Sequence, residues 1–165
     1  MKRLFSPWRS KYIASFKDEK PTHDGECLFC RISRERKDSQ NLVVVRKKLC
    51  YVVMNLYPYN SGHLMIVPYK HTPHFEGLAK AEYADIMAAT SDMIAALGKV
   101  SQPQGFNFGA NLGRVAGAGI DQHVHFHLVP RWSGDTNFMP TIGEVKLVSE
   151  ETKKTYMRLK KAVKQ

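Results

Sequence analysis

Short apolar runs rich in β-branched residues alternate with turn residues in the first half of the chain. Residues 42–45 (LVVV), 51–54 (YVVM) and 63–67 (HLMIV) have this character, which predicts three strands. Residues 57–62 (YPYNSG) have the composition of a turn, and Pro68 ends the third run. We therefore expect an antiparallel meander in this part of the chain.

The hydrophobic period changes in the middle of the sequence. Apolar-face positions three and four residues apart predict a helix over residues 80–99, with Gly98 as its terminator. These positions are Tyr83, Ile86, Met87, Thr90, Ile94 and Leu97. Residues 105–109 and 123–129 then have strand patterns, the second closed by Pro130.

A second helix is expected near the C-terminus. Ser149 is suited to the N-cap, and Glu150 and Glu151 follow it, where carboxylates complement the helix dipole. The apolar face of this helix consists of Tyr156, Leu159 and Val163. The order of elements predicts an α+β fold: an antiparallel sheet of about five strands with a long helix and a C-terminal helix.

The length of 165 residues fits one domain. We expect an N-terminal arm over residues 1–20 and a single domain over residues 21–165. No apolar run approaches the ~20 residues that cross a bilayer, so no membrane association is expected. The basic N-terminus lacks the apolar stretch of a signal peptide, and the three cysteines do not suit a disulfide scaffold. These features favour a cytoplasmic protein.

The chain carries 25 Lys and Arg against 15 Asp and Glu, a formal charge of +10. Such a charge favours anionic partners, either nucleic acid or small phosphate-bearing ligands. A basic terminal helix is also a common solubilising surface, so the charge alone does not select a function.

Three histidines alternate with apolar residues in the segment 123–129 (HVHFHLV). Because side chains alternate along a strand, His123, His125 and His127 are predicted to share one face. A glycine-rich loop, residues 112–120, precedes them. Imidazoles in this arrangement can act as bases, phosphate donors or metal ligands, and an accidental cluster is improbable beside such a loop.

This segment resembles the H-φ-H-φ-H-φ-φ signature of the histidine-triad (HIT) nucleotide hydrolases and transferases. The resemblance extends to residues 27–32 (CLFCRI), 62–71 (GHLMIVPYKH) and the glycine loop. Residues 5–12 and 130–138 are similar to the branch that acts on dinucleoside polyphosphates such as diadenosine tetraphosphate. The resemblance implies a purine nucleotide or dinucleoside polyphosphate as the ligand, and a homodimer.

The resemblance also assigns roles at the phosphate. His125 would attack the α-phosphorus and form a covalent nucleotidyl-histidine, and His127 would contact the transferring phosphate. Asn111 and the backbone near Gly119 would complete the cradle. Many family members have a polar side chain where Gly119 and Ile120 stand, so backbone donors would replace side chains here.

A base pocket is implied by the same resemblance, with Asn55 on the ribose hydroxyls. The implied lining residues are Leu28, Phe29, Ile32, Val53, Met54 and Leu56. Apolar residues in strands are usually core residues, which is an equally good interpretation of this set. Asn55 is more informative, because it interrupts an apolar strand.

The CxxC at Cys27 and Cys30 suggests a zinc site. Some related proteins bind structural zinc with such a pair, the His after the central strand and the first triad His, which here are His71 and His123. The alternative is two buried free thiols. Cys50 is interpreted as a core residue, and His23, His63 and His74 receive no functional role.

Two other functions compete with dinucleoside polyphosphate cleavage, for which the acceptor is either phosphate or water. A nucleoside phosphoramidase would differ only in the leaving group. A zinc-stabilised module that binds nucleic acid or nucleotide without catalysis belongs to another class, but no nucleic-acid motif accompanies the charge, so a nucleic-acid partner is not favoured.

Overall fold

Five antiparallel strands form one sheet in the described part of the chain, in the order β1-β2-β3-β5-β4. This computed structural model describes residues 26–135 and 151–163. The strands are β1 (Val43–Arg46), β2 (Cys50–Met54), β3 (Leu64–Pro68), β4 (Gly105–Gly109) and β5 (Phe126–Arg131). The helices are α2 (Leu28–Glu35), α3 (Lys80–Ser101) and α5 (Thr152–Val163), with 3₁₀ turns at Phe75–Gly77 and Arg114–Ala116. The expected α+β fold and its initial meander are confirmed.

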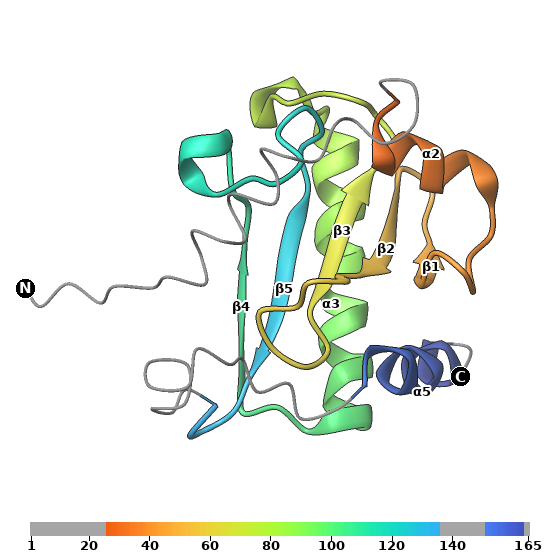
Figure 1. Cartoon of the computed structure of the whole chain (residues 1–165), viewed down its shortest axis with the longest axis vertical. Helices are drawn as coiled ribbons and strands as arrows, with labels where there is room; N and C mark the ends of the chain where they lie inside the picture. Colours follow the sequence, from red (N-terminus) through yellow and green to blue (C-terminus); the bar gives the residue numbers. More distant parts are fainter. Residues whose placement is uncertain (1–25, 136–150, 164–165) are drawn as a thin grey trace, which may run out of the picture.

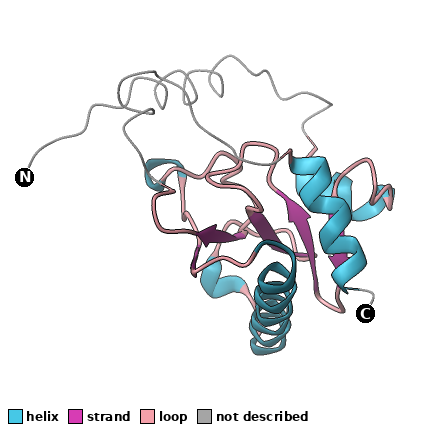
Figure 2. Ribbon diagram, turned by 90° about the horizontal axis from the view of Figure 1, so that it is seen from below, coloured by secondary structure: helices cyan, strands magenta, loops and turns pink. Residues whose placement is uncertain are grey.

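The long helix α3 covers one face of the sheet (Figure 1), and Figure 2 looks along this helix on one side of the strands. Alternate residues of the strands, including Val52, Ile66 and Leu128, pack with Ile86 and Met93 of α3 in the main core. Burial of these side chains is the main contribution to the stability of this layer. The opposite face is thereby left for other elements.

A second, smaller cluster occupies that opposite face. Phe29 and Ile32 of α2 pack there against Val53 and Val67 of the central strands. The side-chain period of two along each strand therefore divides the sheet into a core face and a site face.

The C-terminal helix α5 packs against α3 and β1. Thr155, Tyr156 and Leu159 are its buried residues, and the Tyr156 hydroxyl donates to the Asp38 carbonyl at 3.2 Å. The expected N-cap Ser149 lies outside the described residues, as does the predicted arm of residues 1–20.

Several element boundaries differ from expectation; β5, for example, continues through Pro130 to Arg131 instead of ending before Pro130. Gly98 does not end α3, which continues to Ser101 and ends where Gln102 adopts a left-handed φ of 48° before Pro103. Leu97 and Val100 are both buried, and their packing outweighs the roughly 1 kcal/mol that glycine costs inside a helix. The strand β5 begins at Phe126, later than the expected 123.

No helix among the described residues is both long enough and apolar enough to span a bilayer.

Candidate active site and metal centre

The register of the sheet places His127 in the middle of the site face. His127 lies opposite Met65 on β3 and Gly109 on β4, and Met65 in turn lies opposite Val53 on β2. These residues form one row across the strands, so their side chains point to the same side. The rings of His63 and His125 lie 5.1 and 5.0 Å from the His127 ring, centroid to centroid, and the His123 ring packs against that of His71 at 5.2 Å.

The central histidine of the triad has a fixed tautomer. His125 is 5% exposed, and its Nδ1 lies 2.9 Å from the carbonyl oxygen of His123. A carbonyl oxygen only accepts, so Nδ1 carries the proton and donates it. The lone pair is therefore on Nε2, which is the form that a nucleophilic imidazole requires.

A chain of hydrogen bonds fixes the tautomer of His127 as well. The Tyr59 backbone N–H donates to His63 Nδ1 at 3.0 Å, so His63 carries its proton on Nε2. That nitrogen lies 2.9 Å from His127 Nδ1 and donates to it. His127 therefore carries its own proton on Nε2, a buried atom with no hydrogen-bond partner among the described residues. An N–H held in this way is available to a bound anion.

Burial keeps the three triad imidazoles neutral. Burial lowers the pKa of His123 and of His125, although in each case a backbone carbonyl opposes this shift. Burial, together with the repulsion that a protonated His125 would exert, lowers the pKa of His127 to about 4. The site thus presents neutral rings at physiological pH, one with a lone pair and one with an N–H.

The first triad histidine belongs to a second cluster. His123 Nε2 donates to the Pro68 carbonyl at 3.0 Å, so Nδ1 has the lone pair. This Nδ1 lies 3.4 Å from Cys27 Sγ, 3.7 Å from Cys30 Sγ and 3.3 Å from His71 Nδ1. The four predicted ligands are therefore brought together, with their ligand atoms within 4.8 Å of one another.

Four of the six distances between these ligand atoms fit tetrahedral zinc. Bonds of about 2.3 Å to sulfur and 2.0–2.1 Å to nitrogen require neighbouring ligand atoms to lie about 3.3–3.8 Å apart. Cys30 Sγ and His71 Nδ1 are 3.3 Å apart, which also falls in this range. Without a cation, burial and the adjacent Cys27 raise the pKa of Cys30 to about 11, whereas a dication favours the thiolate.

The glycine-rich loop adds a side-chain amide to the site. Asn111 Nδ2 lies 3.4 Å from the Gly117 carbonyl and 3.5 Å from the Tyr59 hydroxyl. Gly117 has a left-handed φ of 95°, a conformation that favours glycine. Gly119 is exposed in the same loop, so its backbone is accessible to a ligand.

The residues expected to line a base pocket divide into three groups. Phe29, Ile32 and Val53 are buried on the site face. Leu28 and Leu56 are exposed. Met54 packs in the core cluster that faces α3, because it is one residue away from Val53 along β2, and we leave it out of the pocket.

Two residues of the site were not predicted. Met65 lies on the site face between Val53 and His127, and the period of two in residues 63–67 is the signal that places it there. His63 was assigned no role, although it directly contacts His127. Its position at the start of an apolar strand is the signal that could have identified it, because a polar residue in that position needs a partner.

Asn55, the predicted ligand of the ribose, forms hydrogen bonds with His63 and with the backbone of Tyr57. Its Nδ2 donates to His63 Nδ1 at 3.3 Å, and its Oδ1 accepts the Tyr57 backbone N–H at 2.9 Å. Asn55 is only partly buried, which leaves its amide near the surface of the site.

An antiparallel sheet with three alternating histidines on one face, beside a glycine loop, defines a histidine-triad enzyme. Residues 36–134 match the HIT domain family, and the chain belongs to this family. It is 42% identical over 153 residues to an AP-4-A phosphorylase of Mycobacterium tuberculosis, which covers 91% of this chain and 78% of that protein.

Two further comparisons extend this relationship. An adenosine 5'-monophosphoramidase of Schizosaccharomyces pombe is 29% identical over 105 residues, 64% of this chain and 74% of that protein. A Zn-bound histidine triad family protein of Mycobacterium smegmatis has a TM-score of 0.69 at 21% identity, covering 84% of this chain and 94% of that one. The latter shows that the fold is shared.

Proposed function

We propose that this enzyme cleaves a dinucleoside polyphosphate of the diadenosine tetraphosphate type through a covalent nucleotidyl-histidine on His125. The observation that carries the proposal is the 2.9 Å hydrogen bond from His125 Nδ1 to the His123 carbonyl. It directs the lone pair of Nε2 away from the backbone, on the face that also holds the N–H of His127. The 42% identity to an AP-4-A phosphorylase supports the substrate class.

The proposed reaction has two displacements at one phosphorus. His125 Nε2 attacks the α-phosphorus, the N–P bond forms, and the P–O bond to the departing nucleotide breaks with its electron pair on oxygen. An oxygen of inorganic phosphate then attacks the same phosphorus and releases Nε2. With diadenosine tetraphosphate the products are ATP and ADP.

The surrounding donors stabilise the phosphoryl oxygens in this proposal. His127 donates its Nε2 proton, which has no partner among the described residues, to a phosphate oxygen. Asn111 and the backbone N–H groups near Gly119 complete the cradle. Fixed donors of this kind are the main contribution of a protein to phosphoryl transfer.

The retained nucleoside is assigned to the site face beside His127. Phe29, Ile32, Val53 and Met65 are the apolar side chains on this part of the site face, and the assigned Leu28 and Leu56 are exposed. Asn55 is the proposed ligand of the ribose hydroxyls. Apolar walls with a single polar group are typical of nucleoside sites.

Substrate profiling tests this function. The protein is incubated with diadenosine tetraphosphate, with and without inorganic phosphate, and with adenosine 5'-phosphoramidate. ADP and ATP formed only with phosphate support phosphorolysis, whereas AMP and ATP formed without it indicate that water is the acceptor. Rapid turnover of the phosphoramidate alone would contradict our proposal and favour the phosphoramidase activity for which the S. pombe relative is named.

We also propose a structural zinc ion held by Cys27, Cys30, His71 and His123. The support is the proximity of their ligand atoms, since four of the six distances between them match tetrahedral zinc. Zinc would fix the ring of His123, whose carbonyl orients His125, and so connect α2 to the catalytic segment. Because zinc needs thiolates, this site is consistent with the proposed cytoplasmic location.

We propose a homodimer whose interface lies on the long helix α3. Met87 and Ile94 are 54% and 38% exposed, and they lie seven residues apart on one face of α3. A second copy of the chain would cover these apolar side chains. We also propose that the chain consists of an N-terminal arm (residues 1–20) and a single domain (residues 21–165).

A further inference from the structure

The loop between β2 and β3 carries two exposed tyrosines beside the triad. Tyr57 is 61% exposed and Tyr59 is 46% exposed. The ring of Tyr59 lies 4.8 Å from that of His63 and 5.7 Å from that of His127, centroid to centroid. Large aromatic side chains at this level of exposure next to a polar site are typical of ligand-binding surfaces.

Tyr59 and Phe29 are the two ends of a row of neighbouring rings that passes through the triad. The Phe29 ring is 5.0 Å from the His125 ring, and the His125 ring is 5.0 Å from the His127 ring. The four rings therefore follow one another in the order Phe29, His125, His127, Tyr59. Displacement at phosphorus is in line, so the group that leaves departs on the side away from His125. The base pocket assigned to the retained nucleoside includes Phe29, at one end of this row of rings, so the departing nucleotide is assigned to the other end, where Tyr59 lies.

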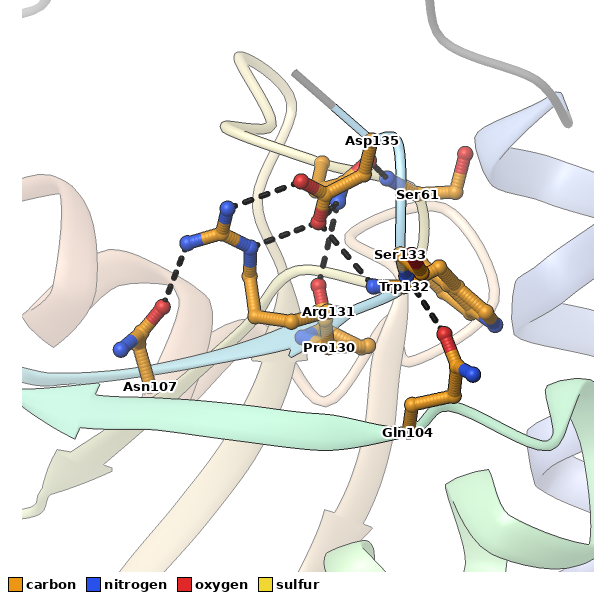
Figure 3. A network of polar contacts seen from close by, with 9 residues as sticks. Ser61, Gln104, Asn107, Pro130, Arg131, Trp132, Ser133 and Asp135 are labelled. Carbon is orange, nitrogen blue, oxygen red and sulfur yellow. Dashed lines mark hydrogen bonds and ion pairs between the residues drawn. The ribbon is translucent and has the colours of Figure 1, made fainter.

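A buried carboxylate holds this loop in place (Figure 3). The Asp135 side chain is 7% exposed, and it accepts hydrogen bonds from Arg131 Nε at 2.6 Å and Asn60 Nδ2 at 2.8 Å. Asn60 Nδ2 also lies 3.2 Å from the Pro130 carbonyl. The residue that follows Tyr59 is thus tied to the end of β5, and a surface fixed in advance loses little entropy when a ligand binds.

We propose that Tyr59, with Tyr57 next to it, is a stacking subsite for the base of the departing nucleotide. The inference rests on the proposed function and names what that function leaves open, namely how the second nucleoside is recognised. A base stacked on an aromatic ring strengthens binding by roughly tenfold or more. The subsite makes the enzyme select dinucleoside polyphosphates over nucleotides that end in a bare phosphate.

Two substrates that differ only in the second nucleoside test the subsite. Diadenosine tetraphosphate and adenosine 5'-tetraphosphate share the attacked phosphorus and the four phosphates. With inorganic phosphate present, we expect Tyr59→Leu to lower kcat/KM for diadenosine tetraphosphate about tenfold and to change kcat/KM for adenosine 5'-tetraphosphate less than about twofold. Tyr59→Trp restores the preference, and the exposed α5 variant Met157→Leu leaves both substrates unchanged.

Equal losses on both substrates would overturn the subsite, because the ring would then act only by supporting His63 and His127. Tyr57→Leu gives a second, milder variant if Tyr59→Leu unfolds, and it is expected to reduce the same ratio. Wild-type protein that turns over neither substrate would contradict the proposed function instead. In that case calorimetric affinities of the His125→Ala protein for the two compounds decide the subsite: equal affinities overturn it, and tighter binding of diadenosine tetraphosphate, lost in Tyr59→Leu, supports it.

Discussion

His63 Nε2 donates a hydrogen bond to His127 Nδ1 across 2.9 Å, and the backbone N–H of Tyr59 fixes the direction of that bond. His63 comes from the β2–β3 connection and His127 from β5, so the orientation of the last triad ring depends on a residue 64 positions away. The Nε2–H of His127 is thus directed into the site while the imidazole stays neutral.

Removal of this donor should impair catalysis more than binding. His63→Ala is expected to lower kcat roughly a hundredfold, a typical value for loss of a positioned proton donor, because His127 loses its fixed tautomer. The Kd for nucleotide should change only a few-fold, since the base pocket is intact. His63→Gln keeps an N–H donor and should recover part of kcat. The exposed His74 supplies the control, and loss of kcat in His74→Ala as well would point to a general effect on the fold.

The proposed zinc site predicts about one metal ion per chain. Metal analysis of the purified protein should give about one equivalent of zinc, which Cys27→Ser should lose together with part of the thermal stability. Cys50→Ala is the matched control, because Cys50 is a buried thiol outside the cluster. Retention of zinc in Cys27→Ser, or its absence from the wild-type protein, would contradict the assignment.

The buried ring of His127 predicts a dependence of stability on pH. The pKa of His127 is lowered to about 4 in the folded state, whereas an unfolded histidine titrates near 6.5. Between these values the unfolded chain binds more protons, so the free energy of unfolding falls as the pH decreases from about 6.5 toward 4. Between pH 7.5 and 5 the loss from this one group is about 2 kcal/mol.

Denaturant titrations of wild-type protein and His127→Asn at both pH values check this. The variant should lose about 2 kcal/mol less than the wild type between pH 7.5 and 5. Identical losses in the two proteins would show that His127 is not the group responsible.

The proposed dimer can be tested on the α3 face. The double substitution Met87→Lys and Ile94→Lys should convert the dimer to a monomer in sedimentation velocity, because it buries two charges in the interface. Met157→Lys, at an exposed α5 position, should leave the dimer intact. A monomeric wild-type protein at micromolar concentration would exclude this proposal.

The sequence was sufficient for the fold and for the four residues of the candidate metal cluster because both depend on simple periodicity and on recognisable residue types. The alternation in residues 123–129 placed three imidazoles together, and the CxxC joined one of them in the structure. What it missed depends on pairing between strands. Met54 and Met65 are equally apolar in sequence. The period of two assigns each of them to one face of its strand, and the register of β2 with β3 and β5 shows that Met65 shares its face with His127.

The role of His63 was hidden for a similar reason. Its position at the start of an apolar strand indicates that it needs a polar partner, but nothing local shows that the partner is His127, 64 positions away. Gly98 shows the opposite case, where a local signal for helix termination was overridden by the burial of Leu97 and Val100 on either side. Local preferences of about 1 kcal/mol are easily outweighed by tertiary packing.

The most direct measurement is mass spectrometry of the protein mixed rapidly with diadenosine tetraphosphate in the absence of inorganic phosphate. The wild-type chain should gain the mass of one adenylyl group, located by fragmentation on His125, and subsequent addition of phosphate should release the group as ADP. His125→Ala should bind the nucleotide without gaining this mass. Turnover by His125→Ala at the wild-type rate, or an adenylyl group on a different residue, would contradict the account.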